Sequence, residues 1–149
     1  MSDFLRAALG RLPHGPEFRF LDRLVSLVPG KEGVGTYRVH GDVPFLRGHF
    51  PGDPILPGVL LLEAVAQLAG VVAQSDPAIP PLADLRLTAV RGAKILGSAR
   101  PGQDVRLEVW ITGRLGGLIQ ARGRASVDAQ EVLVTELTFT GKPPTGMTL

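Results

Sequence analysis

Polar and apolar residues alternate over residues 33–40, where Thr36 and Arg38 fall on one face and Tyr37 and Val39 on the other. Such alternation is typical of a β-strand with one buried face. Other strands are predicted from runs of β-branched, leucine and aromatic residues bounded by glycine, proline or aspartate. These runs are residues 18–28, 82–95, 104–112, 118–127 and 131–139, and a short helix is predicted before them over residues 3–9.

The segment GVLLLEAVAQLAGVVA, residues 58–73, contains only two polar residues, Glu63 and Gln67. A helix that is apolar nearly all round belongs in the protein interior. At about 1.5 Å per residue it spans roughly 24 Å, but a carboxylate near its first third argues against a membrane span. Two strands, one buried helix and four strands together predict an α+β fold in which a largely antiparallel sheet wraps one helix.

The amino-acid composition limits the number of domains, the compartment and the partners that are expected for this protein. A chain of 149 residues, with 44% hydrophobic and 20% charged residues, fits one globular domain, predicted over residues 1–149. The absence of cysteine removes disulfides and thiolate chemistry, and it suits a reducing compartment. The first residues lack the features of a secretory signal, so a cytoplasmic protein is expected. A net charge of only +2 implies no nucleic-acid partner.

Glu63 differs from all of its neighbours in the predicted helix. A carboxylate among apolar residues must be paired, hydrogen-bonded or protonated, because burying a free charge costs roughly several kcal/mol or more. A carboxyl group that stays protonated is a candidate proton donor. A capping or bridging role is the alternative. Gln67 lies four residues further along and shares the same helix face, where by itself it suits a packing role.

His49 is the second candidate, in a segment (residues 42–57) that contains four prolines and therefore has many φ angles preset. Imidazole changes its protonation near neutral pH, so a fixed histidine beside a carboxylic acid can complete an acid–base pair. An ordinary loop histidine is the alternative. Pro57 suits the first turn of the following helix, and free N–H groups at Gly58, at the positive end of the helix dipole, can bind a carbonyl oxygen.

Read together, these candidates lie in the string GHFPGDPILPGVLLLEAVAQLAG, residues 48–70. The string resembles the signature of 3-hydroxyacyl-acyl-carrier-protein dehydratases of type II fatty-acid synthesis. LPHGPEFRFLDR (residues 12–23) and PGQDVRLEV (residues 101–109) resemble further segments of the same family. The resemblance implies a hot-dog fold, in which the sheet wraps the helix, and a homodimer that forms alone or assembles into a trimer of dimers.

The resemblance also implies a mechanism in which His49 and Glu63 come from different subunits. His49 takes the proton from the α-carbon of a (3R)-3-hydroxyacyl thioester while the Gly58 N–H binds the thioester oxygen. Glu63 then protonates the departing hydroxyl, which leaves a trans-2-enoyl thioester, and no metal or redox cofactor is required. The substrate arrives on the phosphopantetheine arm of an acyl carrier protein, and its tail enters an apolar tunnel beside the helix. Further substrate contacts are implied at Phe50, Pro57, Val59 and Gln67.

Some segments depart from the family pattern. Gly15 and Glu17 stand where a basic residue and a proline are usual, and KILGSARPG (residues 94–102) replaces an aromatic and basic run. These departures leave the acid–base pair intact but bear on carrier docking and chain-length preference. Two other functions stay open: a hot-dog acyl thioesterase, which does not explain HFPG, and a non-catalytic acyl-binding subunit. Arg47 and Arg100 are candidates for holding phosphate, and His14 is expected to be structural.

Overall fold

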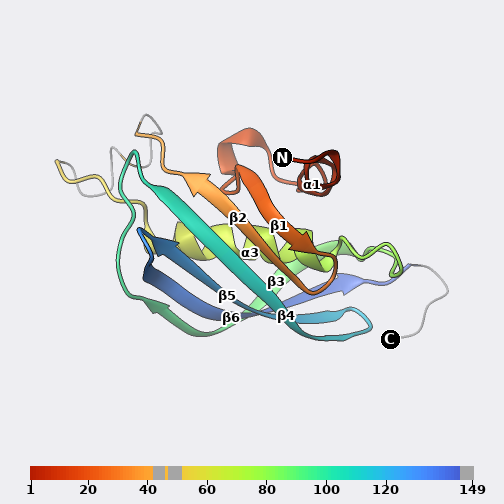
Figure 1. The fold of residues 1–149 in the computed structure, drawn as a ribbon. Coiled ribbons are helices and arrows are strands. Elements are labelled where there is room, and N and C mark those ends of the chain that lie inside the picture. The colour runs from red at the N-terminus through yellow and green to blue at the C-terminus, as the bar shows by residue number, and fades with distance from the viewer. Residues whose placement is uncertain (42–45, 47–51, 145–149) are drawn as a thin grey trace.

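The computed structural model describes residues 1–41, 46 and 52–144 (Figure 1). A six-stranded sheet in the order β1-β2-β4-β5-β6-β3 packs against one long helix, α3 (Gly58–Ala73), and every neighbouring pair of strands is antiparallel. This is the α+β hot-dog arrangement that the resemblance implied. The other elements, in chain order, are α1 (Asp3–Leu9), the 3-10 helix η1 (Pro16–Phe18), β1 (Arg23–Val28), β2 (Glu32–Arg38), β3 (Ala83–Ile95), β4 (Asp104–Leu115), β5 (Leu118–Val127) and β6 (Gln130–Lys142).

Helix α3 is the centre of the hydrophobic core, and its observed bounds coincide with the predicted residues 58–73. Two glycines of the sheet allow the helix to pack closely. A Cβ atom on Gly33 of β2 would lie 2.7 Å from Cγ2 of Val72, and one on Gly123 of β5 would overlap Cγ1 of Val65. A glycine inside a strand often marks such a close approach. No helix in the described part of the chain is long and apolar enough to cross a membrane.

The predicted start of the first strand at Phe18 was wrong. Phe18 ends the η1 turn, and β1 begins only at Arg23. Part of the backbone between these points bonds to the helix: Gln67 Nε2 donates to the carbonyl of Phe18 at 2.9 Å, and Gln67 Oε1 accepts from the N–H of Phe20 at 2.8 Å. Bonding to β2 starts only at Asp22, whose N–H donates to the carbonyl of Thr36 at 2.8 Å. A side chain from α3 therefore takes the polar groups that a longer strand would need.

Two hairpins of the sheet, β4–β5 and β5–β6, also refine the predicted bounds. Strand β4 continues past Gly113 to Leu115, because the reversal is made further on, at Gly116, whose φ of +57° suits glycine. Between β5 and β6, Asp128 and Ala129 have φ angles of 51° and 65°. Two successive left-handed residues form the tight turn that matches the twist of antiparallel strands.

Gly70, inside α3, is expected to tolerate alanine with a gain in stability. A Cβ atom at Gly70 would meet nothing within 4 Å, and glycine inside a helix costs about 0.5–1 kcal/mol relative to alanine. Gly70→Ala should therefore raise Tm by about 2–4 °C, measured by circular dichroism at fixed protein concentration. Gly33→Ala is the matched control and should lower Tm, because its Cβ would collide with Val72. An equal loss of Tm in Gly70→Ala and Gly33→Ala would show that the space beside Gly70 is not open.

Candidate active site

A cavity of about 580 Å³ runs along one side of α3. Its helix wall consists of residues that recur every three or four positions and therefore share one face. The facing wall is formed by residues of and near β3 and β6, which are apolar except for Asp84 and Arg86. The segment after α1 contributes a third wall. The helix wall, hereafter the cavity stripe, is Glu63, Ala66, Gln67, Gly70, Val71 and Gln74; the other walls include Leu82, Leu85, Leu87, Phe139 and residues 11–14.

Glu63 lies on the cavity stripe, and the structure places it differently from the expectation of a carboxylate enclosed among apolar residues. Its side chain is 27% exposed, and Oε2 lies 3.7 Å from Nε2 of His14. This is the separation of an ion pair and is longer than a hydrogen bond. Most apolar residues of α3 point into the core, whereas Glu63 faces the cavity. Its carboxylate is therefore accessible to a ligand in that cavity.

His14 is the residue of this site that sequence reasoning did not assign to it. Its segment is held in place by Arg19, whose Nη2 donates to the carbonyls of Leu12 and His14 at 3.3 and 3.2 Å. The imidazole packs near Phe18, with ring centroids 6.1 Å apart. Nδ1 is buried and has no hydrogen-bond partner in the described part of the structure, so only Nε2 faces a polar group, the carboxylate of Glu63.

The start of α3 is the place where the sequence predicts an oxyanion site. The carbonyl of Pro57 accepts hydrogen bonds from the N–H groups of Leu60 and Leu61 at 2.9 and 3.4 Å. The N–H groups of Gly58 and Val59 precede these and have no partner among the described residues. The Val59 side chain is 70% exposed. Two free N–H groups at the positive end of a 16-residue helix can bind a carbonyl oxygen.

His49 and Phe50 lie outside the described residues, as does Arg47. Their predicted roles therefore stay predictions. Gln67 lines the cavity but is only 2% exposed, and both ends of its amide are bonded to the backbone before β1. Gln67 therefore joins α3 to the segment before β1, whether or not it also contacts a ligand.

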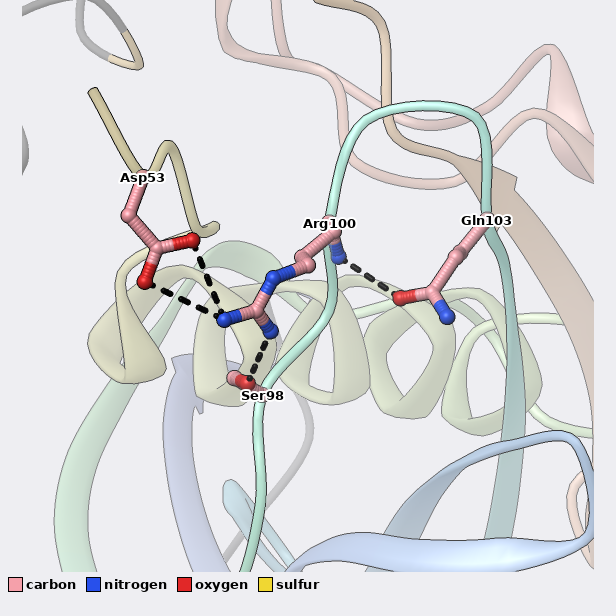
Figure 2. A network of polar contacts seen from close by, with 4 residues as sticks. All are labelled: Asp53, Ser98, Arg100 and Gln103. Atoms are coloured by element: carbon pink, nitrogen blue, oxygen red, sulfur yellow. Dashed lines mark hydrogen bonds and ion pairs between the residues drawn. The ribbon is translucent and has the colours of Figure 1, made fainter.

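Arg100, a candidate for holding phosphate, already has a carboxylate partner (Figure 2). Its Nη2 lies 3.1 and 3.2 Å from the two carboxylate oxygens of Asp53, and its backbone N–H donates to Oε1 of Gln103 at 2.8 Å. Close by, the N–H of Leu56 donates to the carbonyl of Ala99 at 2.8 Å. These bonds attach the residues just before α3 to the connection between β3 and β4.

Two residues with clearly shifted pKa values, Tyr37 and Arg124, lie outside the cavity lining. Burial raises the pKa of Tyr37 on β2, and the charge of Asp22 adds to this effect. A hydrogen bond to Glu108, together with its charge, raises the pKa of Arg124 on β5. Within residues 1–41, 46 and 52–144, no group of three or more His, Asp or Glu side chains could hold a metal ion.

Comparison with known proteins places the chain in a family. Residues 12–136 match the model of the FabA-like domain. The 3-hydroxyacyl-[acyl-carrier-protein] dehydratase FabZ of Chloroflexus aggregans is 38% identical over 141 residues, which is 95% of this chain and 97% of that relative. The chain belongs to the 3-hydroxyacyl-acyl-carrier-protein dehydratase family. Another member of this dehydratase family, the FabZ of Geotalea uraniireducens, is 40% identical over 127 residues, 84% of this chain and 86% of that relative.

Solved structures agree with the fold. The dehydratase heterocomplex ApeI:P from Xenorhabdus doucetiae matches with a TM-score of 0.75 at 18% identity and covers 92% of both chains. An HP0420 homologue from Helicobacter felis matches with a TM-score of 0.70 at 10% identity, over 95% of this chain and 89% of that one. The resemblance in residues 48–70 is thus confirmed for the dehydratase family and its fold, while the role of each site residue stays a prediction.

Proposed function

We propose that the protein is a hydro-lyase that converts (3R)-3-hydroxyacyl thioesters on acyl carrier protein to trans-2-enoyl thioesters, in fatty-acid or related biosynthesis in the cytoplasm. The observation that carries the proposal is the position of Glu63. It is the one carboxylate on the cavity stripe, it faces a cavity whose walls are mainly apolar, and it belongs to a chain 38% identical to a FabZ dehydratase over nearly its whole length.

The proposed chemistry is an acid–base elimination. His49 removes the proton from the α-carbon, the electron pair of that C–H bond forms the double bond, and the bond between C3 and its oxygen breaks. Glu63 gives its proton to the departing hydroxyl, which leaves as water. Negative charge develops on the thioester oxygen, and the free N–H groups at Gly58 and Val59 stabilise it. The proton gained by His49 then replaces the one lost by Glu63.

We propose a homodimer that forms through β3. This strand lies at one edge of the sheet and pairs only with β6. Along its 13 residues only Leu85 and Leu87 are half-buried, and the apolar side chains of Val90 and Ile95 are 44% and 59% exposed. A long exposed edge is a template for pairing with another strand, and two-fold symmetry would pair β3 with its own copy. The other edge, β1, has only six residues and packs against α1.

In such a dimer, the resemblance assigns each active site one His49 and one Glu63 from different chains. Support for this comes from the position of the cavity, because Asp84, Arg86 and Leu87 of β3, the strand along which the second copy would lie, border it. Assembly of three such dimers is the further arrangement that the family resemblance implies, and light scattering on the purified protein distinguishes a dimer from a hexamer by mass.

One assay tests the proposed function against its alternatives. The purified protein is incubated with a 3-hydroxyacyl thioester and, separately, with the matching trans-2-enoyl thioester, while interconversion and free thiol are followed together. A dehydratase interconverts the two without releasing thiol. Thiol release without interconversion would identify a thioesterase, and the absence of both signals would indicate a non-catalytic acyl-binding subunit.

We infer that His14 positions Glu63. His14→Ala should lower kcat about tenfold with little change in KM, because the Glu63 carboxylate would lose the imidazole whose Nε2 lies 3.7 Å from its Oε2. The same substitution should cause no further loss in a Glu63→Gln background, since both act through one group. His40→Ala is the matched control, an exposed histidine after β2 and outside the cavity. Additive losses in the double variant would contradict a role through Glu63.

A further inference from the structure

Gly70 lies in the middle of the cavity stripe, and close packing does not explain why this residue is a glycine. It lies in the interior of α3, where glycine is among the least favourable residues. Close approach of the helix to the sheet accounts for Gly33 and Gly123, but a Cβ atom added to Gly70 would meet nothing within 4 Å. Because Gly70 lines the cavity, a side chain at this position would occupy cavity space.

The walls around Gly70 suit an acyl chain. Gly70 follows Glu63 by seven residues, a separation of about 10 Å along the helix axis. Between them the stripe carries Ala66, another small residue. The facing wall carries the charged residues Asp84 and Arg86. It also carries apolar residues, among them Leu85, which is half-buried, and Phe139, which is 4% exposed. The cavity that Glu63 lines therefore continues past Gly70 to Val71 and Gln74, between walls that are mainly but not entirely apolar.

Beyond Gly70, hydrogen bonds join the walls of the cavity at Gln74. Gln74 Nε2 donates to the carbonyl of Leu82 at 2.7 Å, and Gln74 Oε1 accepts from the N–H of Leu82 at 3.0 Å. Nη1 of Arg11 donates to the carbonyl of Gln74 at 3.4 Å. The end of α3, the residue before β3 and the segment after α1 are thus tied together. A chain that passes Gly70 meets this cluster next.

We propose that Gly70 sets the acyl-chain preference of the enzyme, by leaving room for the tails of long 3-hydroxyacyl thioesters. This inference rests on the proposed dehydration at Glu63 and deepens it. A short substrate ends before it reaches Gly70, whereas a long tail must pass this residue. The size of residue 70 therefore affects how well long substrates fit. It leaves the acid–base chemistry at the other end of the cavity unchanged.

The test compares Gly70→Leu with Gly70→Ala on thioesters of 3-hydroxybutyrate and 3-hydroxydodecanoate. In Gly70→Leu, kcat/KM for the dodecanoyl substrate should fall by roughly 10- to 100-fold relative to the butyryl substrate, because the new side chain occupies the space of several methylenes. In Gly70→Ala this ratio should change by less than about threefold. Gly70→Met is the second bulky variant, and circular dichroism with size-exclusion chromatography establishes that each variant is folded and assembled.

One kinetic result would overturn the inference: an unchanged ratio in both bulky variants when they are folded and assembled, whether kcat/KM stays the same or falls equally on the two substrates. Failure of the proposed function looks different, since the unsubstituted protein would then dehydrate neither substrate. In that case calorimetric binding of 3-hydroxydodecanoyl-pantetheine decides the question. Tight binding that Gly70→Leu weakens at least tenfold would support the tail site, and equal binding by the two proteins would reject it.

Discussion

A dimer that joins one His49→Ala chain to one Glu63→Gln chain is expected to be active, although each variant alone is expected to lose activity by about 100-fold or more. The loss in each variant follows from its role. In the proposed mechanism no base removes the α-proton without His49, and Glu63→Gln cannot donate a proton to the departing hydroxyl. Both variants should remain folded, because Glu63 is partly exposed to the cavity and the substituted side chains are not larger than the originals.

The mixed dimer restores activity only if each site uses both chains. One of its two sites then carries both substitutions and the other carries neither, so purified mixed dimers should have about half of the unsubstituted activity. Two different affinity tags, one on each co-expressed chain, allow the mixed dimers to be isolated. If His49 and Glu63 of one chain share a site, every site of the mixed dimer lacks one residue and no activity returns.

A mixed dimer of His49→Ala with the unsubstituted chain is the control. It should have about half of the full activity under either arrangement, because one site is intact in both cases. This control shows whether tagging and co-purification preserve function. Recovery in the control without recovery in the His49→Ala and Glu63→Gln dimer would contradict the shared site.

Val90→Lys is expected to dissociate the dimer and to lower activity by about 100-fold, because a monomer would hold no complete site. Val90 lies on the exposed edge strand β3, where a lysine opposes pairing with a second copy. Val25→Lys is the matched control: Val25 lies on the opposite edge, β1, and the two valines are 44% and 49% exposed. Light scattering and activity should be measured over the same concentration range.

Light scattering tests whether β3 forms the interface, and the activity tests whether each site needs two chains. A Val90→Lys protein that stays dimeric would show that β3 is not the interface. A monomeric Val90→Lys protein with normal activity would instead show that one chain suffices for catalysis. Dissociation of Val25→Lys and not of Val90→Lys would move the interface to the other edge of the sheet.

Local sequence patterns predicted the elements that have clear local boundaries. Helix α3 and strand β5 have the predicted bounds, because Pro57 introduces the one and turn residues flank the other. The start of β1 was predicted wrongly, because the competing partner of its backbone is Gln67, far along the chain. A pattern within residues 18–28 contains no information about that side chain.

The candidate site likewise has features that the local sequence predicts and features that contacts between distant residues decide. The sequence by itself determined that Glu63 is out of place on an apolar helix, and its resemblance over residues 48–70 determined the family. Only the tertiary structure decided that Glu63 faces a cavity, that His14 lies 3.7 Å from its carboxylate, and that Gly70 opens onto the same space. Periodicity reports which side of one element is apolar, whereas a cavity depends on how several distant elements pack, and that packing is fixed by contacts between residues with no local relation in the chain.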